Sequence, residues 1–336
     1  MSTSTQVHER LATGRSARVS AVLLRHVQTI SIAVVLIALM VYFGSAADNF
    51  FSWANIRIIL ENIAPNVIVA TAMTMVIISA GIDLAVGSTV AVAGAGLALM
   101  LSHHWNTTLA FLAILVCGAV IGGANGYFSQ YQKLQPFIVT LATLSVLSGL
   151  ALLITGGYSI PIPRNAWVAV LGQGKVGPIP VSVIVAAGIA ILGWIVLEKS
   201  PFGRYVVALG SNGESLRRSG VNVRAVGFTV YVLSGVTAAL AGILIATRLG
   251  SGSSNAGGTT FGLTVITAVV LGGTDLFGGR GSIIGTVLGA IVLGVIENGL
   301  ILVHVSSFYV PIVQGAILLI AVLLNTRAFS RFMTSR

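Results

Sequence analysis

The chain is a succession of long apolar segments separated by short polar ones. A membrane-spanning helix needs about 20 consecutive apolar residues, and about ten apolar stretches lie between residues 28 and 326, of which 87–101 and 259–271 are short enough to be partly re-entrant. The pattern therefore predicts an all-α polytopic membrane protein with about ten transmembrane helices. The expected spans are 28–46, 56–80, 87–101, 108–128, 136–155, 181–197, 225–249, 259–271, 281–303 and 309–326.

Two glycine-rich breaks interrupt the apolar pattern, at residues 81–86 and 272–280. Each follows an apolar span, contains an aspartate (Asp83 or Asp275) and precedes a glycine-rich helix. Transporters are often built from two related halves with interrupted segments near the pathway, so the breaks predict two loosely related halves. Each aspartate is either the N-cap of the following helix or a residue of the pathway or its gate, and the sequence leaves both roles open.

Glycines recur every four residues at two places in the chain. Because glycine has no side chain, it allows two membrane helices to approach closely. We interpret six of them as helix-packing positions. They are Gly118, Gly122, Gly126, Gly281, Gly285 and Gly289.

Several polar side chains lie within or next to the expected spans. Polar residues in a membrane bundle face its interior or a water-filled cavity, where they hydrogen-bond between helices or line a pathway. The sequence does not separate these two roles. The candidates for a pathway or gate are Asn66, Asp83, Asn125, Thr140, Thr143, Asp275, Glu297 and Asn298.

The composition also indicates a lipid environment. The chain is 56% hydrophobic and 8% charged, whereas a soluble domain carries about 25% charged residues. The single cysteine, Cys117, excludes an internal disulfide and a cysteine-based metal site. The sequence holds no phosphate-binding G-x-x-x-x-G-K-[ST] motif and no Ser/His/Asp or paired-carboxylate constellation. It therefore indicates a transport protein rather than an enzyme, with no cofactor expected in this chain.

The chain has a net charge of +10, and its basic residues are distributed according to the predicted topology. The basic residues are spread through short loops without interleaved aromatic residues, so nucleic acid is not expected as a partner. With cytoplasmic tails at residues 1–27 and 327–336, 14 of the 18 Lys and Arg residues lie on the cytoplasmic side. This asymmetry follows the positive-inside rule and predicts that both termini are cytoplasmic. The four exceptions are Arg57, Arg164, Lys175 and Arg248.

A polar, basic stretch at residues 199–224 lies between two expected spans on the cytoplasmic side. Asn212 and Gly213 tolerate a left-handed backbone and predict a turn. The residues after them predict a short helix with one acid, Glu214, in its first turn and two arginines in its last, which suits the helix dipole. The stretch is either a loop that only fixes topology or a docking element for a soluble partner.

Five short motifs carry a family resemblance. They are AGIDLAVGS at 80–88, QPFIVTLAT at 135–143, SPFGR at 200–204, ALGSN at 208–212 and AVVLGGTDLFGGRGS at 268–282, followed by Asn298-Gly299. Across residues 55–325 the chain resembles the membrane permease subunits of bacterial ABC importers for monosaccharides, of the ribose, xylose and galactoside type.

The resemblance implies a translocation pathway for a monosaccharide or related polyol in the bacterial inner membrane, within a permease domain at 28–326. The implied partners are membrane lipid, a second permease subunit (identical or not), an extracytoplasmic sugar-binding protein and a cytoplasmic ATPase that holds ATP and Mg. Residues 199–224 would then be the coupling loop to that ATPase. The coupling residues would be Phe202, Gly203, Arg204, Gly210, Asn212, Glu214, Arg217, Arg218 and Gly220.

One position departs from the family pattern. Similar permeases commonly carry an acidic E-L-D-type segment before AVVLGG, whereas here Gly262 and Thr264 replace both acids. The resemblance therefore implies a different pathway lining, with another preferred solute or a non-identical permease partner. An ion-coupled secondary transporter is the alternative function, and it would depend on Asp83, Asp275 and Glu297.

Overall fold

The computed structural model describes residues 30–164 and 166–334. The predicted cytoplasmic tail at 1–27 lies outside these residues, as do the last two residues of the predicted tail at 327–336. Every long element in the described part is an α-helix, which confirms the predicted all-α class. Among the described residues, six helices are long and apolar enough to cross a membrane, and four shorter apolar helices accompany them.

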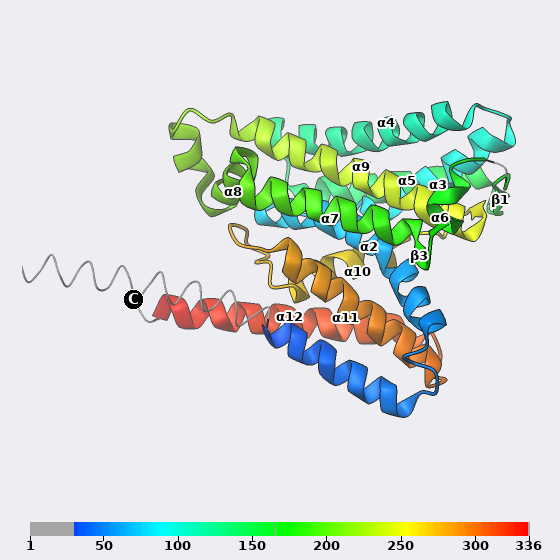
Figure 1. Cartoon of the computed structure of the whole chain (residues 1–336). Helices are drawn as coiled ribbons and strands as arrows, with labels where there is room; N and C mark the ends of the chain where they lie inside the picture. Colours follow the sequence, from blue (N-terminus) through cyan, green and yellow to red (C-terminus); the bar gives the residue numbers. More distant parts are fainter. Residues whose placement is uncertain (1–29, 165, 335–336) are drawn as a thin grey trace, which may run out of the picture.

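The helices follow the predicted apolar segments closely. The first described helix is Ile30–Ala46, dark blue in Figure 1. The elements after it are α2 (Trp53–Ile78), α3 (Val86–Ser102), α4 (Thr107–Gly126), the π-helical turn η1 (Tyr127–Tyr131), α5 (Pro136–Thr155), β1 (Ile160–Pro161), α6 (Ala169–Gln173), β2 (Lys175–Val176), β3 (Ile179–Pro180), α7 (Val181–Lys199), α8 (Pro201–Arg218), α9 (Val223–Leu249), β4 (Ser251–Gly252), α10 (Gly258–Leu271), α11 (Ile283–Leu302) and α12 (Tyr309–Thr334).

Local signals in the sequence set many of these boundaries. Ser52, Asn106 and Ser282 each accept a hydrogen bond from a backbone N–H in the first turn of the following helix, where such groups lack partners within the helix. Gly250 ends α9 in the left-handed conformation that glycine adopts without strain. α12 continues past the predicted end of the last span to Thr334, because no glycine or proline interrupts this part of the chain.

The long helices run roughly side by side, and polar elements gather at two opposite ends (Figure 1). α8 lies at one end, which we call the α8 end. The short strands lie at the other, which we call the loop end; there β1 pairs antiparallel with β4, and β2 with β3. The four basic residues that the charge count assigned to the far side belong to elements at the loop end. They are Arg57, Arg164, Lys175 and Arg248.

The contacts between helices repeat in two sets. In the first set α3 packs against α4, α5 and α9, and α4 packs against α9. In the second set α10 packs against α11, α12 and α2, and α11 packs against α2. Replacing α2–α5 by α9–α12 therefore reproduces the pattern. Because α2 runs toward the α8 end and α9 runs away from it, the two sets have opposite directions, as in the inverted repeats of many transporters.

α3 and α10 are short helices that begin inside the bundle. They contain 17 and 14 residues, fewer than the roughly 20 that a full span requires. A Cβ atom on Gly87, near the start of α3, would overlap the carbonyl oxygen of Gly258, the first residue of α10. Gly242, well inside α9, packs against the Val90 carbonyl of α3, so this crossing lies between the two ends of the bundle. The segments before α3 and α10, 79–85 and 250–257, lead from an end of the bundle into its interior.

The pairing of the two breaks that was predicted from the sequence is wrong. It related residues 81–86 to 272–280, whereas the contact pattern relates 79–85 to 250–257. The later break instead connects α10 to α11 at the α8 end. The two glycine–aspartate motifs have similar sequences but different surroundings. Asp83 is buried, whereas Asp275 is partly exposed in a surface turn.

Candidate coupling and translocation sites

The candidate coupling element, α8, is a broken helix rather than a loop. Pro201 begins it, at a position where its missing N–H costs no hydrogen bond. Asn212 has an extended backbone (φ −161°, ψ 85°) that interrupts the helix. Its Oδ1 accepts a hydrogen bond from the Ser215 N–H at 2.9 Å, so it caps the short helix predicted after it. The turn predicted at Asn212 and Gly213 is a break in the helix, and it is not left-handed, because neither residue has a positive φ.

The exposed tip of α8 carries a compact charge cluster. Glu214 Oε1 accepts hydrogen bonds from Arg217 Nη2 at 2.8 Å and from Arg218 Nε at 3.1 Å. These bonds, first that of Arg217 and then that of Arg218, lower the pKa of Glu214 from 4.5 to about 2. A lowered pKa means that the ionised cluster stabilises the tip above about pH 4.5, and that this stabilisation is lost only as the pH falls through about 2. The charge of the tip is therefore constant across physiological pH.

The opposite face of α8 packs against the ends of two other segments. A Cβ atom on Gly210 would overlap the carbonyl oxygen of Ile78, the last residue of α2, and would lie 2.6 Å from the Gly279 nitrogen. The Gly279 N–H in turn donates a hydrogen bond to the Ile78 carbonyl at 2.8 Å. α8, the end of α2 and the α10–α11 connection thus meet backbone to backbone.

The nine predicted coupling residues divide into two groups. Three face the bundle, and of these Gly203 packs against the Leu197 carbonyl of α7, where it holds the α7–α8 corner. Contact with an ATPase stays a prediction for the whole set. Phe202, Gly203 and Gly210 face inward, and Arg204, Asn212, Glu214, Arg217, Arg218 and Gly220 are exposed.

Asp83 joins the segment 79–85, which precedes α3, to α9 by a hydrogen bond. Its Oδ2 accepts a hydrogen bond from the Ser234 hydroxyl of α9 at 2.8 Å, and its Oδ1 accepts one from the Ala85 N–H at 3.1 Å. The Ile82 carbonyl accepts a hydrogen bond from the Thr140 hydroxyl of α5 at 3.3 Å. Asp83 is 2% exposed, and it does not line the cavity described below. Ala85, rather than Asp83, is the N-cap of α3, and no side chain caps this helix, so the N-cap role predicted for Asp83 is wrong. The geometry gives no support to a pathway role either.

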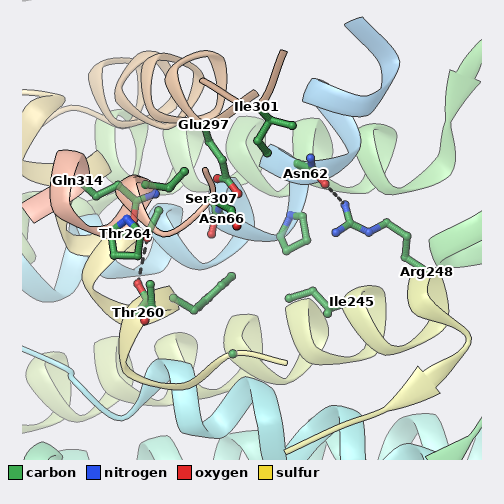
Figure 2. Close-up of a pocket in the computed structure, with 15 residues that line it drawn as sticks. Asn62, Asn66, Ile245, Arg248, Thr260, Thr264, Glu297, Ile301, Ser307 and Gln314 are labelled. Carbon is green, nitrogen blue, oxygen red and sulfur yellow. Dashed lines mark hydrogen bonds between the residues drawn. The ribbon is translucent and has the colours of Figure 1, made fainter. Parts of the chain in front are cut away.

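A cavity of about 360 Å³ with a mixed polar and apolar lining lies between α2, α9, α10, α11 and α12, toward the loop end (Figure 2). Two predicted pathway candidates, Asn66 and Glu297, line it. Figure 2 shows both side chains pointing into the same space from different helices. The other polar lining residues are Asn62, Arg248, Thr260, Thr264, Ser307 and Gln314.

Arg248 is held at one side of this cavity. Its Nη1 donates hydrogen bonds to the Glu61 carbonyl at 2.7 Å and to Asn62 Oδ1 at 2.8 Å. It also interacts electrostatically with Glu61 and Glu297. The Glu61 carboxylate forms a 3.3 Å ion pair with Arg57. The positive charge of Arg248 therefore balances the carboxylate of Glu297 in the cavity.

On the opposite side, Thr264 and Gln314 form a buried polar pair. The Thr264 hydroxyl lies 2.9 Å from Gln314 Oε1 and 2.9 Å from the Thr260 carbonyl. A hydroxyl carries a single proton, so it satisfies only one of these acceptors at a time. Thr264 and Gln314 are 8% and 9% exposed.

Sequence reasoning missed most of the cavity. Arg248 entered only the charge count, and Gln314 was overlooked although it is a polar residue in an apolar span, which is the signal for an interior position. Thr264 was noted only as the replacement of an acid. These residues come together because α2, α9, α10, α11 and α12 converge, and no local pattern predicts that convergence.

The remaining predicted pathway candidates are engaged in other contacts. Thr143 donates a hydrogen bond to Asn125 Oδ1 at 2.7 Å, which joins α5 to α4. Asp275 accepts a hydrogen bond from the Phe277 N–H at 3.0 Å within its own turn. Asn298 pairs with Asn55 of α2. None of these residues lines the cavity.

Asn298→Ala is expected to destabilise the protein by about 1–2 kcal/mol. Asn55 and Asn298 exchange two side-chain hydrogen bonds, of 3.0 and 2.9 Å, and both are buried. The substitution leaves the Asn55 amide without this partner. Thermal unfolding of the detergent-solubilised protein measures the effect, with Asn255→Ala in the exposed loop before α10 as the control. Equal melting temperatures for the two variants would contradict the prediction.

Five of the six predicted packing glycines lie on helices at close backbone contacts, whereas Gly281 precedes α11 and meets side chains. Side-chain atoms on Gly118 and Gly122 of α4 would overlap the backbone carbonyls of Gly235 and Tyr231 in α9. Gly126 also faces α9, Gly285 and Gly289 approach the end of α10, and Gly281 lies against Ile78. These contacts are all made within one chain.

Comparison with known proteins connects this geometry to a family. A family model described as branched-chain amino acid transport system / permease component matches residues 55–322. The ribose import permease of Haemophilus influenzae is 38% identical over 86% of this chain and 90% of its own length. The ribose import permease of Bacillus subtilis is 39% identical over 83% of this chain and 87% of its own length. The xylose transport system permease of Haemophilus influenzae is 31% identical over 90% of this chain and 96% of its own length.

No solved structure matches the chain. The apolar helices and the permease relatives support a multi-pass protein of the inner membrane, and the permease family indicates a transport subunit. Because the family model covers most of the chain and the relatives align over most of their length, the chain belongs to the family of branched-chain amino acid transport system / permease components.

Proposed function

We propose that this chain forms the translocation pathway of an ABC importer for a monosaccharide or related polyol. The family description mentions branched-chain amino acids, whereas the relatives carry the names of ribose and xylose permeases. We give the relatives more weight, because an identity of 38% over 293 residues is more specific than a description shared by a whole family. In this proposal ATP and Mg bind to a separate cytoplasmic ATPase, and an extracytoplasmic sugar-binding protein delivers the solute.

The proposal includes a topology. Ten helices enter or cross the membrane, with the α8 end and both termini in the cytoplasm and the loop end outside. The placement of Arg57, Arg164, Lys175 and Arg248 at the loop end supports this orientation, since the other basic residues predominate on the cytoplasmic side. A second permease subunit, identical or not, completes the pathway. Its interface does not use Gly118 and Gly122, because these positions already pack within one chain.

One observation carries the coupling mechanism: α8 touches the end of α2 and the α10–α11 connection through backbone atoms at Gly210. ATP binding draws two ATPase domains together, and the exposed tip of α8 moves with them. Because Gly210 leaves no space between α8 and Ile78, this motion is passed to α2 and to the break that follows it. The alternating opening of the two ends is thereby linked to the ATP cycle.

Charge reversal at the tip tests this proposal. Arg218→Glu is expected to reduce ATP-driven uptake about tenfold in proteoliposomes that contain the whole importer, because it places a second acid beside Glu214 on the docking surface. The matched control is Lys175→Glu, an exposed reversal in β2 at the loop end. We expect the control to retain the ATPase rate and to couple that rate to uptake normally.

Two outcomes would contradict the proposal. Unchanged uptake in Arg218→Glu would remove α8 from the coupling mechanism. Uptake by the chain alone, abolished by collapsing an ion gradient, would favour the ion-coupled alternative. The structure gives that alternative little support. The acids on which it would depend lie in three separate places; they are Asp83, Asp275 and Glu297.

A further inference from the structure

We infer that the cavity between α2, α9, α10, α11 and α12 is a transient binding site for a neutral polyhydroxyl solute, recognised by Asn66, Thr264, Glu297 and Gln314. This inference rests on the proposed function and adds a defined solute site to it. The four residues come from four different helices. Figure 2 shows them around one space, with Arg248 at its far side.

Position along the helices supports the choice of these four residues. On each of the four helices, the residue named is the lining residue closest to the α8 end. Together they form the floor of the cavity, while Asn62, Arg248 and Ser307 lie nearer the loop end. A solute that enters from the loop end therefore reaches the polar floor last. In the proposed topology this is the extracytoplasmic half of the pathway.

The size of the cavity suits a small solute. Its volume is about 360 Å³, and small-molecule sites span about 300–1,000 Å³. The site is therefore near the lower limit of that range, which favours a monosaccharide over a larger saccharide.

The floor has hydrogen-bonding capacity that the described residues leave unused. Asn66 Oδ1 is buried and has no hydrogen-bond partner. Within the described residues, no hydrogen bond reaches the Glu297 carboxylate, and Gln314 bonds only through the single hydroxyl of Thr264. A buried polar group without a partner is unfavourable, so an entering solute that supplies one is stabilised. Hydroxyl groups suit every member of the set, because each hydroxyl both donates and accepts.

The charges of the site favour a neutral solute. The carboxylate of Glu297 is balanced by Arg248, which is already bound to the Glu61 carbonyl and to Asn62. An amino acid would bring two further charges into a site whose single acid and single base already balance each other. Asn66, Thr264 and Gln314 are uncharged, so Glu297 is the one acid among the lining residues.

Uptake by the complete importer in proteoliposomes tests the inference, with D-ribose, D-xylose and L-leucine as labelled probes. The variants are Thr264→Val and Gln314→Leu, which nearly preserve shape and remove the polar groups of the floor. The control is Thr259→Val, an exposed threonine on the same helix that does not line the cavity. We expect sugar uptake to fall about tenfold in both floor variants and to stay unchanged in the control.

Further readouts separate solute recognition from folding and from coupling. Thr264→Ser retains the hydroxyl and is expected to restore uptake, which a merely misfolded variant would not do. ATP hydrolysis stimulated by the binding protein is expected to persist in the floor variants, because α8 is untouched. Sugar uptake that is unchanged in Thr264→Val and Gln314→Leu would overturn the solute site and leave the importer intact. Wild-type uptake of L-leucine without sugar uptake would overturn both the site and the proposed substrate class.

Discussion

Gly210→Val is expected to abolish ATP-driven uptake. A side chain at this position would overlap the Ile78 carbonyl and lie 2.6 Å from the Gly279 nitrogen, and neither backbone atom is able to rotate away as a side chain does. Overpacking of a close contact costs about 1–3 kcal/mol, here concentrated where α8 meets α2 and the α10–α11 connection. The overlap is confined to the α8 end of the bundle, so the protein is expected to fold and reach the membrane.

The control is Gly213→Ala, on the same helix and three residues away. An added Cβ there would meet only the end of the Leu209 side chain, at 3.3 Å, which is free to change rotamer. Uptake and ATPase rates in proteoliposomes should remain normal in this control. In Gly210→Val, hydrolysis should continue while solute import is lost. Normal import in Gly210→Val would show that α8 does not act through Ile78 and Gly279.

The second large effect is expected for Gly87→Val. Gly87 lies where α3 and α10 begin, and even a Cβ would overlap the Gly258 carbonyl and lie 3.2 Å from the Gly262 nitrogen. The two short helices meet here inside the bundle, so separating them breaks the contact between the two repeated sets. We expect loss of stability of about 1–3 kcal/mol or more, and a fall of several degrees in melting temperature.

Gly262→Ala provides the comparison, because it adds a methyl group to the same helix crossing from the α10 side. Its nearest neighbour would be the Leu84 carbonyl at 3.5 Å, an ordinary van der Waals distance. Thermal unfolding monitored by size-exclusion chromatography distinguishes the two variants. A melting temperature for Gly87→Val that equals that of Gly262→Ala would refute the tight crossing of α3 and α10.

The sequence alone determined the secondary structure and the fold class. Apolar segments of about membrane length specify helices because every backbone N–H and C=O in lipid needs a partner within the segment. The boundaries followed from local chemistry: α5 spans the predicted residues 136–155, and Asn212 breaks α8 where the turn was expected, although with an extended backbone. The charge count assigned four basic residues to one side, and the fold places all four at the loop end. Motifs were sufficient to identify the permease family.

Only the tertiary structure decided which residues share a site. Glu297 and Asn298 are neighbours in sequence, yet a helix turns about 100° per residue, so one lines the cavity and the other pairs with Asn55. Asp83 and Asp275 have similar motifs but different surroundings, because burial is set by the helices packed around each break. Thr264 and Gln314 meet across 50 residues, at a distance fixed by the packing of α10 against α12. Lipid imposes the helices through local hydrogen bonding, whereas the cavity results from long-range packing between helices that no single segment encodes.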